Sequence, residues 1–382
     1  MINGVPLIAN LIVGNEVPVI LRKVLKSIRP YVDDIIVGYN GNDGNVEDVL
    51  KEFNCNYFKQ VWENDFAKAR NEVLDKTPSH TLVLWLDSDD EIINGDKIQD
   101  TCETVFCHPE TDGVACEWEY AFDKNGNCTA SLWRERIVKR DSHRWSSNKL
   151  HETLDSINEK EEGLMISCEG FKIKHLATAE KMMKAAKRNV DIIQKQYEEE
   201  VKSGNLTPKT VYDCARSHQG ANHLERAIKL FKDYIDINGI SDEEKCITYT
   251  ILGDIYRFQK NYTESKRCAI MVIMFGSNIP DGYIDLGFNL FLEQKYHPAM
   301  CLLEMSYKFK PCKSFPINPV KYTLQPMKLL AVCYLYNGRY EEAKACAEYV
   351  LTKMHDEPIM LNVVSTCIEA IEKNKNFEEG NK

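Results

Sequence analysis

The first half of the chain alternates short apolar runs with amphipathic segments. Apolar runs at 6–13, 34–39 and 82–86 have the length of strands, and the segments at 17–28 and 46–53 have the spacing of helices. An alternation of strand and helix implies a parallel sheet. The run at 82–86 carries no polar residue, so we expect this strand to lie near the centre of the sheet. The pattern therefore predicts an α/β domain.

Beyond about residue 182 the strand signals fade and a helical pattern repeats. Four segments of similar sequence begin at Asn222, Asn261, Lys295 and Arg339, at spacings of 39, 34 and 44 residues. Helix-like stretches that carry Tyr, Leu and a small residue precede them. This is the helix–turn–helix pattern of tetratricopeptide repeats, whose period is about 34 residues. An insertion at 311–319 lengthens the last spacing, and we predict an all-α repeat domain.

The chain of 382 residues exceeds the size of one typical domain, about 100–200 residues. We expect an α/β domain at 1–180, a linker helix at 181–207, helical repeats at 208–375 and a frayed polar tail at 376–382.

Composition limits the classes of protein that fit. No apolar run approaches the ~20 residues of a membrane span, and the apolar start lacks the basic segment of a signal peptide. We expect a protein without a membrane span, located in the cytoplasm, or in the host cytoplasm if a virus encodes it. The 14 cysteines form no Cys-x-x-Cys pair, which favours buried reduced thiols over a zinc site. The net charge of −10 argues against a broad contact with nucleic acid or an anionic membrane.

An acidic cluster follows directly after the strand at 82–86. It consists of Asp87, Asp89, Asp90 and Glu91. Ligands of open α/β sheets bind beyond the carboxyl ends of the strands, so chemistry is expected here. Four neighbouring carboxylates repel one another unless a cation neutralises them, and oxygen ligands suit Mg²⁺ or Mn²⁺, which often bridge to substrate phosphates. The alternative is a solvated acidic turn that caps the next helix.

Two sequence runs resemble the signature of family 2 glycosyltransferases of the GT-A fold that carry C-terminal tetratricopeptide repeats. They are Trp-Glu-Asn-Asp-Phe-Ala-Lys-Ala-Arg-Asn at 62–71 and Leu-Trp-Leu-Asp-Ser-Asp-Asp-Glu at 84–91. The resemblance extends to Asn15-Glu16 and to 150–153 and 174–176. It implies a Rossmann-like nucleotide-diphospho-sugar transferase domain, followed by an all-α tetratricopeptide-like domain, and a hexosyltransferase-like enzyme.

The resemblance implies roles for the residues that hold the donor. The Asp-x-Asp motif, Asp87-Ser88-Asp89, would hold the nucleotide-sugar, with Asp87 near the ribose or a metal-bound water. Asp89 would coordinate the Mn²⁺ or Mg²⁺ ion that bridges the diphosphate. Asn40 would lie near the nucleobase and ribose. Because Tyr39 and Asn40 replace the usual acidic residue of the family, the nucleotide stays open, with UDP expected.

Further donor contacts follow from the same resemblance. Arg70 and Asn71 would shape the sugar pocket, and Asp65 would contact the sugar or the nucleotide; the alternative is a helix N-cap or a surface pair. A basic run on a later helical segment is a candidate for holding the diphosphate, and alternatively a solvated helix face. This run consists of Lys181, Lys184, Lys187 and Arg188.

Glu152 is the candidate general base. It lies where GT-A enzymes place the carboxylate on the acceptor side, and an inverting transfer needs a base to take the proton of the acceptor. His175 resembles the C-terminal histidine that ligates the metal in many GT-A enzymes; the alternative is a hydrogen-bonded histidine at a strand end. His151 is a rival for this role, since imidazole also ligates Mn²⁺.

These features predict a metal-dependent inverting glycosyltransferase that uses a nucleoside-diphosphate sugar. The acceptor classes are a peptide or protein, a glycan, or a modified base in DNA. Repeats of this kind present surfaces to peptides or proteins or associate with a second copy, so a homo-oligomer is a further expectation. One alternative is a non-catalytic repeat scaffold with a degenerate sugar-nucleotide domain. Another is a nucleotidyltransferase, which would need a Gly-rich basic loop where 13–16 provides none.

Overall fold

The computed structural model describes residues 1–123, 126–146, 149–150, 152–157, 164–176, 179–276, 278–311 and 318–380. Its contacts divide the chain into two compact units. The first is Met1–Ala121 with Ser131–His223, and the second is Phe122–Ala130 with Leu224–Lys382. The predicted boundaries at 180 and 207 stay predictions.

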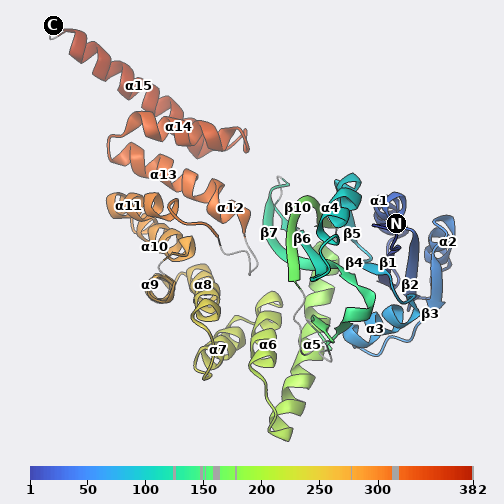
Figure 1. The fold of residues 1–382 in the computed structure, drawn as a ribbon. Helices are drawn as coiled ribbons and strands as arrows, with labels where there is room; N and C mark the ends of the chain where they lie inside the picture. The colour runs from blue at the N-terminus through green and yellow to red at the C-terminus, as the bar shows by residue number, and fades with distance from the viewer. Residues whose placement is uncertain are drawn as a thin grey trace. The chain divides into compact units, whose positions relative to one another are not determined.

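The first unit is built on one mixed sheet of eight strands (Figure 1). The strands are β1 (Leu7–Val13), β2 (Asp34–Tyr39), β3 (Asn56–Lys59), β4 (Leu82–Asp87), β5 (Asp90–Ile93), β6 (Thr111–Phe122), β7 (Cys128–Lys139) and β10 (Leu164–His175). Their order is β3-β2-β1-β4-β7-β6-β10-β5. The first four strands in this order pair in parallel, and β7 pairs antiparallel with β4. The predicted parallel sheet with the apolar strand at its centre is thus confirmed, whereas the long strands β6 and β7 had no clear signal in the sequence.

Helices cover both faces of this sheet. They are α1 (Pro18–Ile28), α2 (Gly44–Glu52), α3 (Phe66–Lys76) and α4 (Ile98–Val105). Every residue of β1 is buried. Alternate residues such as Leu11 share a core with α1, α2 and α4, while Ile12 packs on the opposite side with Val73 of α3. Burial on both faces explains why these strands are continuously apolar.

The connection from β4 to β5 brings two distant parts of the chain together. After a two-residue turn β5 pairs antiparallel with the end of β10, and the register places His175 opposite Asp90. The N–H of Leu176 also donates to the carbonyl of Asp89 over 2.7 Å. The acidic motif therefore lies beside the end of β10, although 85 residues separate Asp90 from His175 along the chain.

A small two-stranded sheet and two helices complete the first unit. They are β8 (His143–Trp145) with β9 (Leu154–Ser156), and α5 (Ala179–Ser203) with α6 (Pro208–Gly220). The hydroxyl of Thr207 caps α6 by accepting from the N–H of Thr210. Gln196 of α5 donates to the Thr210 hydroxyl over 3.2 Å, which helps to join the two helices.

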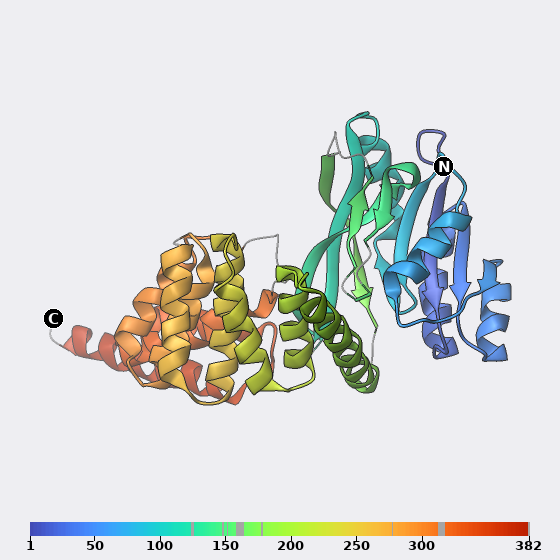
Figure 2. The same ribbon diagram turned by 90° about the horizontal axis from the view of Figure 1, so that it is seen from below.

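The second unit is a stack of helices that pack mostly as antiparallel pairs (Figure 2). The helices are α7 (Leu224–Ile235), α8 (Asp242–Phe258), α9 (Tyr262–Phe275), α10 (Pro280–Leu292), α11 (Tyr296–Ser306), α12 (Pro319–Tyr322), α13 (Leu324–Tyr336), α14 (Tyr340–Leu351) and α15 (Pro358–Gly380). Helices α8 and α9, α10 and α11, and α13 and α14 form the pairs, and each pair packs on the next. None of the helices in the described ranges is long and apolar enough to cross a membrane.

The same type of turn connects the two helices in each of these three pairs. One residue adopts a left-handed conformation, and the N–H after it donates to a carbonyl five residues earlier over 2.8–2.9 Å. This is the Schellman arrangement that ends a helix. The left-handed residues are Lys260, Gln294 and Gly338. The segments predicted at Asn261, Lys295 and Arg339 begin right after these turns, so the helical repeat is confirmed.

Small residues recur where the two helices of a pair cross. A Cβ on Gly287 would lie 3.0 Å from Cγ of Leu303 and 3.4 Å from the carbonyl oxygen of Ala299. The second helix of each pair has a small, fully buried residue four positions after its first segment residue. These are Ser265, Ala299 and Ala343. The repeat is therefore visible in packing as well as in turn geometry.

Candidate active site

The acidic motif forms the hairpin turn between β4 and β5. Asp87 ends β4, Ser88 and Asp89 form the turn, and Asp90 begins β5. The carboxylates therefore lie at the carboxyl end of the central strand, as the sequence predicted. Their surroundings differ strongly, and this difference decides what each can do.

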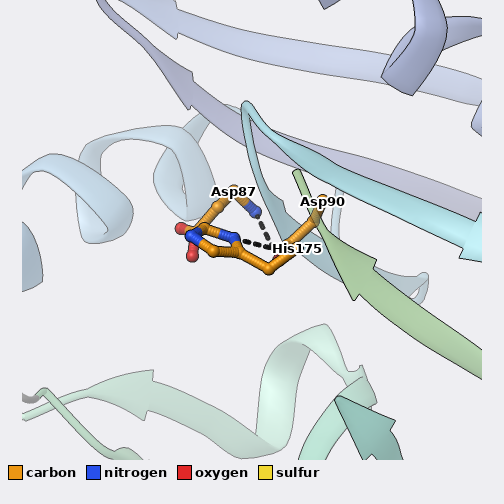
Figure 3. A group of neighbouring side chains, drawn as sticks. All are labelled: Asp87, Asp90 and His175. Atoms are coloured by element: carbon orange, nitrogen blue, oxygen red, sulfur yellow. Dashed lines mark hydrogen bonds and ion pairs between the residues drawn. The ribbon is translucent and has the colours of Figure 1, made fainter. Parts of the chain in front are cut away.

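Asp90 is fully buried, and Figure 3 shows its contacts with His175 and Asp87. Its Oδ2 lies 3.1 Å from Nη1 of Arg136 and accepts from the backbone N–H of Asp87 over 3.2 Å. Its Oδ1 accepts from the indole N–H of Trp118 over 2.9 Å and lies 3.0 Å from Nδ1 of His175. With both oxygens engaged, Asp90 orients its neighbours instead of offering a vacant ligand atom.

Arg136 supplies the buried counter-charge. Its guanidinium lies 3.9 Å from the ring centre of Trp85 and 4.8 Å from that of Trp118. Burial lowers the pKa of Arg136, against the opposing effect of the Asp90 and Asp87 carboxylates. A buried cation of this kind persists only with a buried anion beside it. Arg136 and Asp90 therefore form a structural ion pair beneath the hairpin.

Asp90 also fixes the orientation of His175. Burial lowers the pKa of the imidazole, but the hydrogen bond to Asp90 and the charges of Asp89 and Asp87 raise it, and the net pKa is raised. The ring stacks on Tyr120 at 5.6 Å. In the neutral imidazole, with Nδ1–H donating to Asp90, Nε2 carries the lone pair, and within the described chain no hydrogen bond to Nε2 is found. His175 can therefore present Nε2 to a ligand.

Arg70 joins Asp87 to Glu152. Its Nη2 lies 2.6 Å from Oδ1 of Asp87, and its Nε lies 2.7 Å from Oε1 of Glu152. The guanidinium is only 7% exposed and lies 4.8 Å from the ring centres of both Trp85 and Trp145. Burial lowers the pKa of Arg70, but the two carboxylates raise it more. The structure thus brings the predicted base into one cluster with the acidic motif.

Asp89 is paired with a lysine from α5. Its Oδ2 lies 2.8 Å from Nζ of Lys181, and its Oδ1 lies 3.5 Å from Nδ1 of His175. Lys181 also lies 2.7 Å from Oε2 of Glu16, whose Oε1 accepts from the Ser88 hydroxyl over 2.7 Å. Burial raises the pKa of Asp89, although His175 and Lys181 act to lower it. The Asp-x-Asp turn is therefore contacted both by Glu16, in the loop after β1, and by Lys181 of α5.

The residues present fit a divalent cation. Ligand atoms of Asp87, Asp90 and His175 lie within 4.8 Å of one another. Asp89 is outside this group, but its Oδ1 lies 3.5 Å from Nδ1 of His175, whereas Asp90 is already saturated by the protein. Asp87 and Asp89 are therefore the candidate oxygen ligands, with His175 as the nitrogen ligand. Carboxylates outnumber the permanently charged cations in the cluster, so a divalent ion would relieve repulsion. Among the described residues, the carboxylates are Glu16, Asp87, Asp89, Asp90 and Glu152, and the cations are Arg70, Arg136 and Lys181 in direct ion pairs and Arg188, whose charge acts on Asp87 and Glu16. Hard oxygen ligands with one imidazole suit Mn²⁺ or Mg²⁺.

Among the described residues, the predicted side chains of Asn40, Asp65 and Lys187 make no hydrogen bond or ion pair with this cluster. Asp65 caps α3 by accepting from the N–H of Lys68 over 2.8 Å, which is the N-cap alternative that the sequence left open. Asn40 directly follows β2. Lys187 is exposed on α5 and, among the residues that the structure describes, makes no hydrogen bond or ion pair. His151 lies outside the described residues.

Sequence reasoning missed the residue that organises the cluster. Arg136 received no role, although an arginine directly before the apolar Ile137 and Val138 of a strand is a usable signal of a buried ion pair. Glu16 was noted only as part of a resemblance. Its contact with Lys181 spans 165 residues of sequence and could not be read from spacing.

Comparisons with known proteins agree with this geometry. The model of the family described as glycosyl transferase family 2 matches residues 11–173. That range begins in β1 and ends in β10, and it contains the acidic hairpin and Glu152. No curated protein is similar enough to the chain to match it.

Solved structures similar to the chain include tetratricopeptide-repeat proteins. The crystal structure of MamA is 15% identical, covers 52% of this chain and 98% of its own, and has a TM-score of 0.34. YrrB, described as a TPR protein with an unusual peptide-binding site, is 15% identical, with coverages of 49% and 99% and a TM-score of 0.34. The first TPR domain of human RPAP3 is 16% identical, with coverages of 34% and 95% and a TM-score of 0.28.

The site and the repeat geometry lead to one assignment. The acidic hairpin lies inside the range of the family match, and the shared turns and buried small residues define the helical repeats independently of any comparison. Residues 11–173 are thus a glycosyl transferase family 2 domain of GT-A type, which the chain joins to tetratricopeptide-like helical repeats.

Proposed function

We propose that the protein is a metal-dependent inverting glycosyltransferase that transfers a sugar from a nucleoside-diphosphate donor, with UDP as the expected nucleotide. The observation that carries the proposal is the cluster at the end of β4. There Asp87, Asp89 and His175 lie together with Glu152 inside a glycosyl transferase family 2 domain.

Asp89 and His175 would hold the divalent cation, with Asp87 beside them. When bound, the ion would neutralise the negative charge that develops on the departing diphosphate. The chain's part is to fix these ligands before the donor arrives. Asp90 orients the imidazole, and Arg70 holds Asp87. Ligands held in this way lose little entropy when the donor binds.

Glu152 is the proposed general base. It would take the proton of the acceptor's hydroxyl or amide as the nucleophile attacks the anomeric carbon. The bond between that carbon and the diphosphate oxygen breaks, the electron pair leaves with the diphosphate, and attack from the opposite face inverts the configuration. Arg70 fixes Oε1 of Glu152 at 2.7 Å, and no hydrogen bond to Oε2 is found within the described chain, so Oε2 is the oxygen that would accept the proton.

The acceptor is proposed by class only. A peptide or protein, a glycan and a modified DNA base each offer a suitable nucleophile. The net charge of −10 speaks against a broad hold on DNA. Helical repeats offer an extended surface for a polypeptide, and they also support association of two copies. We therefore rank a peptide or protein acceptor first.

The alternative is a non-catalytic scaffold with a degenerate donor site. One observation favours it: Asp87 and Asp89 each already bind a cation of the protein, Arg70 and Lys181. A scaffold of this kind would show no metal-dependent affinity for any nucleotide-sugar. This difference makes the two functions separable by binding alone.

Thermal shifts against a panel of nucleotide-sugars, with and without Mn²⁺, test the proposal. A ligand that binds only the folded protein raises the melting temperature in proportion to its affinity. We expect one donor to stabilise the wild type only with Mn²⁺, and Asp89→Ala to lose this effect. Protein that is folded yet unaffected by every donor would instead support the scaffold.

Glu152→Gln separates binding from chemistry. We expect it to keep the Mn²⁺-dependent thermal shift and to release nucleotide from the donor roughly 10²–10⁴-fold more slowly, because a lost general base costs this much. The measurement is nucleotide release in the presence of candidate acceptors. Unchanged release by Glu152→Gln would assign the base to another residue.

A further inference from the structure

Lys181 forms an ion pair with Asp89, the proposed metal ligand. It lies in the first turn of α5, and its Nζ is 2.8 Å from Oδ2 of Asp89 and 2.7 Å from Oε2 of Glu16. Glu16 is tied to the hairpin by the hydroxyl of Ser88. One ammonium thus bridges the Asp-x-Asp turn and the loop after β1.

The three permanent cations that pair directly with carboxylates of the cluster differ in how firmly they are held. Arg136 is fully buried, and Arg70 is 7% exposed and packed between two indole rings. Lys181 is 40% exposed. A lysine is also a point charge on a flexible stem, whereas Arg70 donates from Nε and Nη2 to two carboxylates and Arg136 packs against two indole rings. Lys181 is therefore the cation that can leave its carboxylate at the least cost.

We propose that Lys181 is an exchangeable counter-ion of Asp89: it competes with the divalent metal for this carboxylate and moves to the donor diphosphate when the metal enters. The inference rests on the proposed function, since it takes Asp89 to be the metal ligand. It adds a role for Lys181 and Glu16 that the proposed function does not require.

The charge of the site favours an exchange of Lys181 for the metal at Asp89 over a site in which Lys181 takes the place of the metal permanently. The cluster already has more carboxylates than permanent cations, and a diphosphate would add further negative charge. A divalent ion at Asp89 offsets that charge, and the released ammonium can then form charge-assisted bonds to phosphate oxygens. Glu16 would hold Lys181 close to the site during the exchange, because its other oxygen stays bound to Ser88.

Titration of the full-length protein with Mn²⁺ alone tests the competition. By calorimetry without nucleotide, we expect Lys181→Met to bind Mn²⁺ about tenfold more tightly than the wild type, because a competing cation has been removed. Lys195→Met is the matched control, since Lys195 is exposed on the same helix and changes the net charge equally. It should leave the affinity unchanged.

Binding of UDP in saturating Mn²⁺ tests the second half of the exchange. Here Lys181→Met should bind about tenfold more weakly, because it has lost a contact with the diphosphate. The opposite signs of the two effects are a readout that loss of folding would not produce. Melting temperatures of each variant in EDTA confirm that the compared proteins are folded.

The outcomes separate the inference from the function beneath it. Mn²⁺ binding that is lost in Asp89→Ala but is not tightened by Lys181→Met overturns the exchange and leaves the metal site standing. Mn²⁺ binding that is unaffected by Asp89→Ala contradicts the proposed function itself. Wild-type binding of UDP that is equally tight without Mn²⁺ shows that Lys181 replaces the metal, which also overturns the exchange.

Discussion

The buried ion pair beneath the acidic hairpin gives a prediction that needs no ligand. Asp90→Asn keeps the size of the side chain but leaves the fully buried Arg136 without its nearest anion. Removing one partner of such a pair costs about 3–5 kcal/mol, because a charge then stays buried without compensation. Asp87 also acts on Arg136 and offsets part of this loss. We therefore expect about 3 kcal/mol, at the low end of the range.

Tryptophan fluorescence can follow this change in the first unit alone. All five tryptophans of the chain lie between residues 62 and 145. At about 2–4 °C per kcal/mol for a unit of this size, the melting temperature should fall by roughly 6–12 °C. The experiment is run in EDTA, so that metal binding does not contribute.

A double variant checks the reasoning. In Asp90→Asn with Arg136→Met the unpaired charge is removed, and we expect at least about 2 kcal/mol of the loss to be regained, since an apolar replacement of a buried pair is often tolerated. If Asp90→Asn costs less than about 1 kcal/mol, the pair is not the structural element inferred here. If the double variant is less stable than Asp90→Asn alone, the unpaired charge is not the cause of the loss.

Two further predictions concern pH and the repeat unit. The raised pKa of His175 means that its protonation stabilises the folded first unit at low pH, and this contribution is lost as the pH rises above the ordinary histidine value of about 6.5. Denaturation followed by tryptophan fluorescence at pH 5.5 and 8 should therefore show a stability difference that His175→Gln reduces; an unchanged difference would contradict the raised pKa. In the second unit the buried Lys321 lies 2.9 and 2.8 Å from carboxylates of Asp281 and Asp285, so Lys321→Met should cost about 3–5 kcal/mol, read from helical circular dichroism. The exposed Lys353→Met is its control, and equal stabilities of the two variants would refute the buried charge cluster.

Local patterns were enough to predict most of the fold. The strand at 34–39 and the apolar centre at 82–86 were predicted correctly because burial on both faces leaves a continuous apolar run. The repeat segments were visible because each must place a small residue at a helix crossing after a tight turn. The strands at 111–122 and 128–139 were missed because many of their residues are only partly buried and alternate weakly.

The sequence named candidate residues that the structure brings together, but it did not indicate the contacts between them. The acidic cluster at a strand end indicated Asp87 and Asp89, because ligands bind at such strand ends, and the family resemblance indicated Glu152 and His175. The sequence could not indicate which cation neutralises which carboxylate, because that depends on contacts across 17 to 165 residues of sequence. The pairing of Arg70 with both Asp87 and Glu152 is the clearest case.

Two ion pairs of the hairpin differ in exposure: the one at Asp90 is fully buried, whereas the one at Asp89 includes a half-exposed lysine. Asp90 is locked by a buried arginine, an indole and a backbone N–H, and it holds His175 in turn. Asp89 faces a half-exposed lysine instead. A site in which every carboxylate had a buried partner would gain nothing from a metal, and one without partners would be unstable in its absence. A fixed framework around one exchangeable cation would therefore allow the protein to be stable without a metal and still to accept the divalent ion and diphosphate that the proposed function requires.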